Sequence, residues 1–173
     1  QRDILAQQPV AIDSSMTARD LFDVLSAIGV SLFRTNFPKL QKGRLVGYPQ
    51  DVENRLYYSA DSINFEKDNF IDWAQDADAI DRKVRAFTFP PFQSAQSTLE
   101  WLHGVRIVLI GDTESEGGFT DKIPGSIIEL TRAGCLRVAT GRGILCIGKL
   151  DGKCPEDYIR SLACQLHDIL FRM

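Results

Sequence analysis

The stretch SIIELTRAGCLRVATGRGILCIGKL, residues 126–150, contains three short apolar segments divided by turns that contain glycine. The segments at 126–131, 135–139 and 144–150 are rich in Ile, Leu and Val and have the length of β-strands. Glycine adopts turn conformations at little steric cost, so the residues between the segments can reverse the chain. The stretch therefore predicts three consecutive strands.

Two further strands are expected upstream, at 97–102 and 105–110, joined by a tight turn at His103 and Gly104. Five strands at a spacing of about ten residues are typical of a small β-barrel. A helix of period 3.6 then begins near Pro155. Its apolar positions are Tyr158, Ile159, Leu162, Ala163, Leu166, Ile169 and Leu170. The sequence thus predicts an OB-like barrel of five strands followed by a C-terminal helix.

Residues 71–87, before the strands, have apolar side chains at helical spacing and predict another helix. These positions are Ala74, Ala77, Ile80, Val84 and Phe87. Pro90 and Pro91 prevent this helix from continuing beyond Phe89. Residues 43–70 show no dominant period and mix Gly, Pro, Asn, Asp and aromatic residues, which indicates a connector between two domains.

The N-terminal residues have the pattern of a strand followed by an amphipathic helix. Residues 4–12 are apolar and short, and Thr17 and Asp20 have the spacing of a capping box before a helix that ends near Leu40. This unit is typical of the last strand and helix of an α/β domain. We therefore expect an α+β chain with three parts: the end of an N-terminal α/β domain at 1–42, a connector at 43–70, and a helix with a small barrel domain at 71–173.

Composition and charge argue against several classes of protein. The 173 residues are 44% hydrophobic and 25% charged, with a formal net charge of −3. From residue 71 onward there are 12 Lys or Arg and 14 Asp or Glu, so no basic field favours nucleic acid. No apolar run reaches the length of a membrane span, and residues 1–3 do not begin a signal peptide. The expected location is the cytoplasm, without a membrane or nucleic-acid partner.

The four cysteines, at positions 135, 146, 154 and 164, contain no C-x-x-C pair, and the chain has two histidines. This spacing does not predict a metal site. Each cysteine lies in or beside an apolar segment, so we expect small, buried or half-buried thiols in a reducing compartment.

Several stretches in this order resemble the folate-dependent formyltransferase family, which includes methionyl-tRNA formyltransferase and the sugar N-formyltransferases. They are DILAQ at 3–7, FIDW at 70–73, IDRKVRAF at 80–87, PGSII at 124–128 and VATGRGIL at 138–145. Each stretch is short, but their order and intervals together cover nearly the whole chain. They also agree with the strands and helices expected from the residues themselves.

The resemblance implies that residues 1–42 are the last strand and helix of an N-terminal Rossmann-like catalytic domain. In the family this domain binds the co-substrate N10-formyltetrahydrofolate and carries a catalytic Asn, His and Asp. The family's Asp opens the motif Asp-x-Gly-Asp-Ile-Leu, and the matching residues here begin one position after it. Asp3 therefore corresponds to the second acid of the motif, beside the folate, and Arg2 replaces the usual Gly. No residue of this chain matches a catalytic position, so the chain alone is expected to be inert.

The best candidate for ligand contact is the segment that runs from Arg85 through Phe89-Pro90-Pro91 to Phe92. A cationic side chain and aromatic rings held by a diproline can bind a phosphate and a base or sugar. The resemblance supports this interpretation, because sugar N-formyltransferases have a similar Phe-Pro-Pro-aromatic sequence near the nucleotide-sugar site. Alternatively, the phenylalanine rings pack into the barrel.

Tyr57 and Tyr58 are further candidates, because an aromatic side chain on a loop between domains can stack on a nucleotide base. They could equally pack the connector against a domain. Within the family, charge and the Phe-Pro-Pro-Phe sequence favour a nucleotide-linked amino sugar as the acceptor. The alternatives are a methionyl-tRNA formyltransferase-like enzyme and a non-catalytic barrel that binds a partner. The quaternary state stays open, with a homodimer among the options.

Overall fold

The structure, a computed structural model, describes residues 3–51, 59, 62–92, 94–101 and 104–170. The chain divides into two compact units, Gln1–Ile63 and Asn64–Met173. Among the described residues, no helix has both the length and the apolar character that a membrane span requires.

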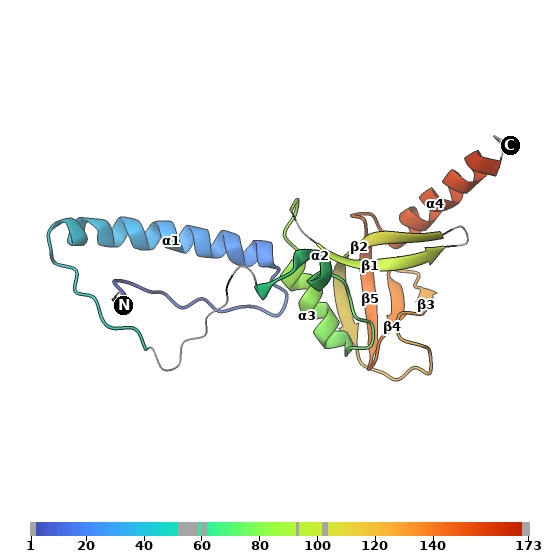
Figure 1. Ribbon diagram of the computed structural model, residues 1–173, viewed down its shortest axis with the longest axis horizontal. Helices are drawn as coiled ribbons and strands as arrows, with labels where there is room; N and C mark the ends of the chain where they lie inside the picture. Colours follow the sequence, from blue (N-terminus) through green and yellow to red (C-terminus); the bar gives the residue numbers. More distant parts are fainter. Residues whose placement is uncertain (1–2, 52–58, 60–61, 93, 102–103, 171–173) are drawn as a thin grey trace. The chain divides into compact units, whose positions relative to one another are not determined.

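The first unit is built on the long helix α1 (Ala18–Gln41), coloured from blue to cyan in Figure 1. The expected capping box is confirmed: the backbone N–H of Asp20 donates to Thr17 Oγ1 at 3.2 Å, and the backbone N–H of Thr17 donates to Asp20 Oδ2 at 3.0 Å. The side-chain hydrogen bond from Thr17 stabilises the carboxylate and lowers the pKa of Asp20. The helix ends one residue beyond the predicted Leu40.

The strand expected at residues 4–12 is not formed as a regular strand, although all these residues are described. Ile4 alone makes a bridge, exchanging backbone hydrogen bonds of 2.9 and 3.0 Å with Tyr48. An extended segment becomes a strand only where a neighbouring segment pairs with it. Within the described part of the first unit, residues 4–12 find that pairing only at Tyr48.

The second unit contains an antiparallel sheet of five strands in the order β1-β2-β5-β4-β3. The strands are β1 (Ala95–Trp101), β2 (Gly104–Glu116), β3 (Ile127–Leu130), β4 (Leu136–Ala139) and β5 (Ile144–Leu150). The α+β class and the five expected strands are confirmed. Among the described residues β1 and β3 each pair with one strand, and the other side of β1 makes only an isolated bridge between Gln96 and Phe70. The two edge strands do not pair with each other, so the sheet is open and not a closed barrel.

Strand β2 is longer than expected. The strand was expected to end at residue 110, but Glu114, Ser115 and Glu116 continue β2 and pair with Cys146, Leu145 and Ile144 of β5. The polar sequence of this part of β2 does not predict a strand. About half of the backbone pairing of β2 comes from β5, a partner about 30 positions away in the chain.

The core lies between the sheet and helix α3 (Ala77–Phe87), which packs mainly on β2 and also contacts β5 and β1 (Figure 1). Helix α4 (Pro155–Leu170) contacts β5, and its Tyr158 and Leu162 belong to the same core. The other buried members are Ile71, Ile80, Val84, Ala95, Val108, Ile110, Leu136, Val138, Leu145, Ile147 and Leu150. Alternation along β2, with Val108 and Ile110 inside and Ile107 and Leu109 outside, follows from the pleat of a strand.

The predicted helix at residues 71–87 begins later than expected, at Ala77. A short helix α2 (Phe65–Asp68) precedes it, and residues 71–76 are irregular. Ile71 donates its backbone N–H to Gln96 O at 2.8 Å, and Asp72 Oδ1 accepts the backbone N–H of Ala74 at 3.0 Å. These bonds fix a non-helical path that apolar spacing alone cannot reveal.

The expectation of free thiols is wrong for two of the four cysteines. Cys135 and Cys146 form a disulfide, with their Cα atoms 5.9 Å apart. The pairing of β4 with β5 places Arg137 opposite Cys146, so Cys135 lies diagonally across from Cys146. This neighbourhood depends on the register of the two strands and is not visible in the spacing of the cysteines. Cys154 is free and exposed.

Candidate functional site

The C-terminal end of α3 leads directly into the predicted ligand-contact segment. Thr88 ends the helix: its Oγ1 donates to Val84 O at 2.7 Å, and its backbone N–H donates to Arg85 O at 3.2 Å. Pro90 and Pro91 follow, joined by a cis peptide bond. The chain then turns so that the backbone N–H of Phe92 donates to Phe89 O at 2.9 Å.

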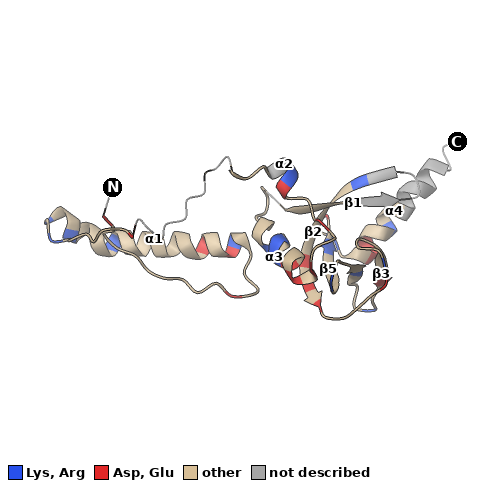
Figure 2. Ribbon diagram, turned by 60° about the horizontal axis from the view of Figure 1, so that its bottom comes forward, with Lys and Arg blue, Asp and Glu red and all other residues tan. Residues whose placement is uncertain are grey.

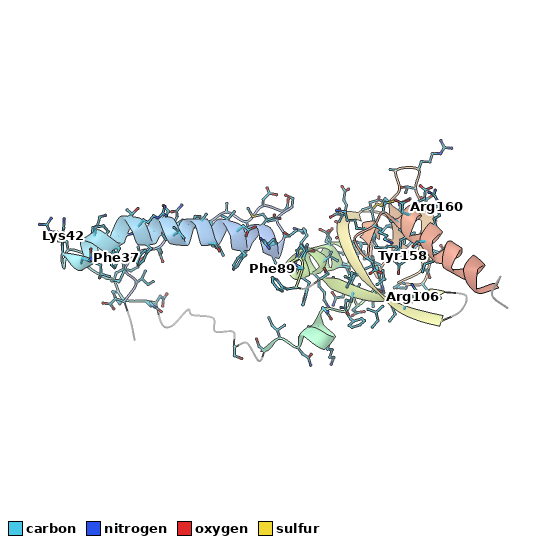
Figure 3. The ribbon with its side chains drawn as sticks, turned by 90° about the horizontal axis from the view of Figure 1, so that it is seen from above. Phe37, Lys42, Phe89, Arg106, Tyr158 and Arg160 are labelled. Carbon is cyan, nitrogen blue, oxygen red and sulfur yellow. A yellow bond between two sulfur atoms is a disulfide. The ribbon has the colours of Figure 1, made fainter. Side chains whose placement is uncertain are left out.

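The three phenylalanine rings of this segment have different environments. Phe87 packs against the core, Phe89 is half-buried, and Phe92 is 81% exposed. The rings of Phe89 and Phe92 have centroids 6.2 Å apart with an interplanar angle of 38°. Figure 3 labels Phe89, whose side chain lies beside the end of α3. The structure therefore brings Phe89 and Phe92 together at the surface and directs Phe87 inward.

Arg85 lies in the last turn of α3 and is held by Asp81. Arg85 Nε and one terminal nitrogen lie 3.1 and 3.0 Å from Asp81 Oδ2. The other carboxylate oxygen, Asp81 Oδ1, accepts a hydrogen bond of 2.7 Å from the Thr113 hydroxyl on β2. The side chains of Arg85 and Asp81 are 21% and 14% exposed. Arg85 is thus part of a hydrogen-bonded group that spans α3 and β2.

Sequence reasoning did not identify Asp81 and Thr113. The spacing of four residues between Asp81 and Arg85 on a helix is a signal that could have suggested the first contact. The contact of Thr113 with Asp81 joins residues 32 positions apart and depends on how α3 packs on the sheet. No pattern in the sequence indicates it.

Of the other predicted site residues, Asp3 is described by the structure. Asp3 belongs to the first unit and is exposed beside Gly47, where an added Cβ would lie 2.7 Å from the Cβ of Asp3. The absence of a side chain at Gly47 therefore allows the connector to pass directly against Asp3. Tyr57 and Tyr58 lie outside the described residues, as does His103.

The turn at Thr140-Gly141-Arg142-Gly143 contacts the residues that lead into α3. Gly141 donates its backbone N–H to Trp73 O at 2.9 Å and to Gln75 O at 3.0 Å. Arg142 accepts from the backbone N–H of Ala77 at 2.9 Å and pairs with Asp76 at 2.7 Å. The buried Thr140 hydroxyl donates within the turn to Arg142 O and Gly143 O. This motif is a turn, as expected, and it positions the first residues of α3.

A separate pocket of about 280 Å³ lies within the first unit. It is lined by Ile4, Leu5, Ala6, Leu32, Phe33, Asn36, Phe37, Leu40 and Leu45. Its one amide, on Asn36, donates to Leu32 O at 2.9 Å, and the rings of Phe33 and Phe37 stack with centroids 4.9 Å apart. This apolar lining suits an apolar side chain better than a charged nucleotide.

Basic and acidic residues alternate along the ribbon of the second unit (Figure 2). Arg137 contacts Glu129 at 2.6 Å and Glu116 at 2.8 Å, and the hydrogen bond to Glu129 contributes most to raising the pKa of Arg137. Other ion pairs join Arg142 to Asp76, Lys149 to Asp112 and Arg160 to Glu156. Within the described part of the chain, no cluster of His, Cys, Asp or Glu could hold a metal ion.

Comparison with known proteins agrees with this architecture. A methionyl-tRNA formyltransferase of Coxiella burnetii is 32% identical over 148 residues, which cover 86% of this chain and 44% of that protein. One from Clostridium novyi is 28% identical and covers 97% of this chain and 53% of that protein. The chain therefore spans about half the length of these relatives.

A solved structure with a similar fold is the N-formyltransferase from Helicobacter canadensis in complex with folinic acid and dTDP-3-aminofucose. The TM-score is 0.61 at 20% sequence identity, covering 86% of this chain and 50% of that one. This likeness concerns the fold. The family model "Formyl transferase, C-terminal domain" matches residues 65–160, more than half of the chain. The chain therefore belongs to the formyl transferase family, whose C-terminal domain it contains.

Proposed function

We propose that this chain is the C-terminal portion of an N-formyltransferase that transfers a formyl group from N10-formyltetrahydrofolate to a nucleotide-linked amino sugar. The observation that carries the proposal is the pair of rings of Phe89 and Phe92 just after α3, with Arg85 in the last turn of that helix. Phe92 is 81% exposed, although a large ring gains free energy by leaving water. An aromatic ring suits the flat face of a nucleobase, and a guanidinium nearby in the chain suits the polar groups of a sugar.

In this reaction the acceptor nitrogen forms a bond to the formyl carbon, and the bond from that carbon to N10 of the folate breaks. The acceptor nitrogen loses a proton, and N10 takes one up. Base catalysis and oxyanion stabilisation are roles that we assign to residues outside this chain. The chain's own contribution is to bind the nucleotide end of the acceptor, with Asp3 on the folate side. Tyr57 and Tyr58 are further candidates for contact with the base.

The charge distribution supports a small nucleotide acceptor over a tRNA. Among the basic residues of the second unit, these have carboxylate partners: Arg85, Arg137, Arg142, Lys149 and Arg160. Binding to a polynucleotide backbone gains affinity when cationic side chains replace condensed counterions. Side chains that already have carboxylate partners are poorly suited to this role.

The second candidate function is formylation of methionyl-tRNA. The relatives from Coxiella burnetii and Clostridium novyi are both methionyl-tRNA formyltransferases, at 32% and 28% identity. This identity is higher than the 20% shared with the N-formyltransferase from Helicobacter canadensis. Because the relatives extend well beyond this chain, the choice of acceptor has to be tested on the full-length protein.

The Phe92→Ala variant tests the proposed acceptor site. If Phe92 stacks on the nucleotide, its loss should raise the KM for the nucleotide sugar about tenfold to a hundredfold, by analogy with stacking on nucleic-acid bases. The melting temperature and the KM for the formyl-folate should change little, because the ring is exposed. Steady-state kinetics and thermal melting on the same protein measure all three quantities.

Phe87→Ala is the matched control, because Phe87 is two residues from Phe89 and packs against the core. Its loss should destabilise the fold by about 3 to 5 kcal/mol. Phe119→Ala removes a ring that is 95% exposed elsewhere on the second unit. This variant should change neither the melting temperature nor the acceptor KM. A Phe92→Ala protein with a lowered melting temperature and an unchanged acceptor KM would refute the proposed site.

A further inference from the structure

Asp81 connects the proposed acceptor site to the sheet. Its Oδ2 atom accepts from Arg85 on the same helix, at 3.1 Å from Nε and 3.0 Å from a terminal nitrogen. Its Oδ1 atom accepts the hydroxyl of Thr113 at 2.7 Å. Thr113 lies on β2, where it pairs with Ile147 of β5, near the centre of the sheet. The three side chains therefore form one chain of hydrogen bonds from β2 to Arg85.

This arrangement restricts the Arg85 side chain before any ligand binds. A free arginine samples many rotamers, and fixing them on binding lowers affinity. At 14% exposure Asp81 is largely shielded from water, which strengthens its hydrogen bonds relative to those of a surface pair. Thr113 restricts Asp81 in turn, because a carboxylate held at both oxygens cannot rotate without losing a bond.

The Asp81 carboxylate also neutralises the charge of Arg85. Arg85 therefore differs from a lone cation that attracts any phosphate. Its contribution to the site is a plane of N–H donors with a fixed direction, which suits the carbonyl oxygens of a base or the hydroxyls of a sugar. Direction matters more for such neutral acceptors than for a phosphate, so the position of Arg85 becomes important for affinity.

We infer that Thr113 is a positioning residue for the acceptor site: its hydroxyl holds Asp81, and Asp81 holds the Arg85 guanidinium at the end of α3. The inference rests on the proposed function. Thr113 is not required merely to attach α3 to the sheet, because Ile80 and Val84 of α3 are fully buried in the core that also contains Val108 and Ile110 of β2. Removal of one hydroxyl leaves that packing in place.

The test compares Thr113→Val with Thr113→Ser in the full-length protein. Valine has nearly the same shape as threonine and suits a strand, but it lacks the donor, whereas serine keeps the hydroxyl. We expect Thr113→Val to raise the KM for the nucleotide sugar about two- to tenfold, the fold-change that corresponds to one hydrogen bond. The kcat and the KM for the formyl-folate should stay close to wild type, and Thr113→Ser should restore the acceptor KM to within about twofold.

Arg85→Ala and the double variant Arg85→Ala/Thr113→Val complete the test. If Thr113 acts through Arg85, Thr113→Val should have no further effect on the acceptor KM once Arg85 is absent. An equal effect in both backgrounds would overturn the inference. The inference would also be overturned if Arg85→Ala raised the acceptor KM while Thr113→Val left it unchanged. In that case the proposed acceptor site would still stand. If neither variant changes the acceptor KM, Arg85 is not in the site, and the inference fails together with that assignment. Thr113→Ala replaces the valine variant if the latter does not fold.

Discussion

Among the described glycines, Gly141 makes the closest approach to another part of the chain. A Cβ atom added there would overlap the carbonyl oxygen of Ala74, an atom of the backbone that cannot swing away. The close approach permits the hydrogen bonds from Gly141 N to Trp73 O and Gln75 O. Those bonds fix the residues that lead into α3, and so the direction of the helix that carries Arg85.

Gly141→Ala should therefore destabilise the protein severely. We expect a loss of more than about 3 kcal/mol, because the backbone of residues 73–75 must shift and two hydrogen bonds are disturbed. For a domain of this size the loss corresponds to a fall in Tm of more than about 10 °C. Gly117→Ala is the control: an added Cβ meets nothing within 4 Å at Gly117, so its Tm should be close to wild type. Similar melting of the two variants would show that the turn does not contact residues 73–75 as described.

At the scale of elements, helix α4 is attached to the sheet through Tyr158. Tyr158 is 5% exposed. Burial contributes most to raising its pKa, and the negative charge of Asp151 raises it further, while Arg106 acts in the opposite direction. Asp151 also accepts the backbone N–H of Leu109 of β2 at 2.7 Å. Figure 3 labels Arg106 and Tyr158 in the second unit.

This attachment predicts a loss of stability in alkali. The folded protein keeps the Tyr158 phenol protonated at a pH where the unfolded chain, with a pKa near 10.0, has begun to lose the proton. The stability from Tyr158 is therefore complete below about pH 10 and is lost as the pH rises through the raised pKa. Urea unfolding between pH 8 and 11 should show a steeper fall in the free energy of unfolding for wild type than for Tyr158→Phe. Parallel curves for the two proteins would contradict this account of Tyr158.

The elements that could be predicted from the sequence are those whose patterns are local. The strands at 126–150, the helix capped by Thr17 and the helix after Pro155 depend on apolar spacing and on turn and capping residues, all within one segment. The predictions for the end of β2 and for residues 71–76 were wrong, because the structure of each segment depends on a partner segment far away in the chain. The site divides in the same way: the segment from Arg85 to Phe92 stands out locally, whereas the contact of Asp81 with Thr113 needs the packed fold.

At the scale of the whole molecule, the chain contains two units and about half the length of its relatives. The second unit has the fold of the family's C-terminal domain, with five of its basic side chains in ion pairs and the exposed ring of Phe92 beside Phe89 after the end of α3. These features together lead to the central claim, that the acceptor is a nucleotide-linked amino sugar. The identity shared with methionyl-tRNA formyltransferases makes tRNA the alternative that has to be tested against it.

The most direct test is a comparison of two acceptors with the full-length protein and N10-formyltetrahydrofolate. Initial rates of formylation would be measured with a panel of dTDP- and UDP-linked amino sugars and with methionylated initiator tRNA, under identical conditions. We predict that at least one nucleotide-linked amino sugar is formylated with a kcat/KM at least about a hundredfold above that of the tRNA, a difference of about 2.7 kcal/mol in transition-state binding. Efficient formylation of the tRNA, with no turnover of any amino sugar in the panel, would contradict the claim.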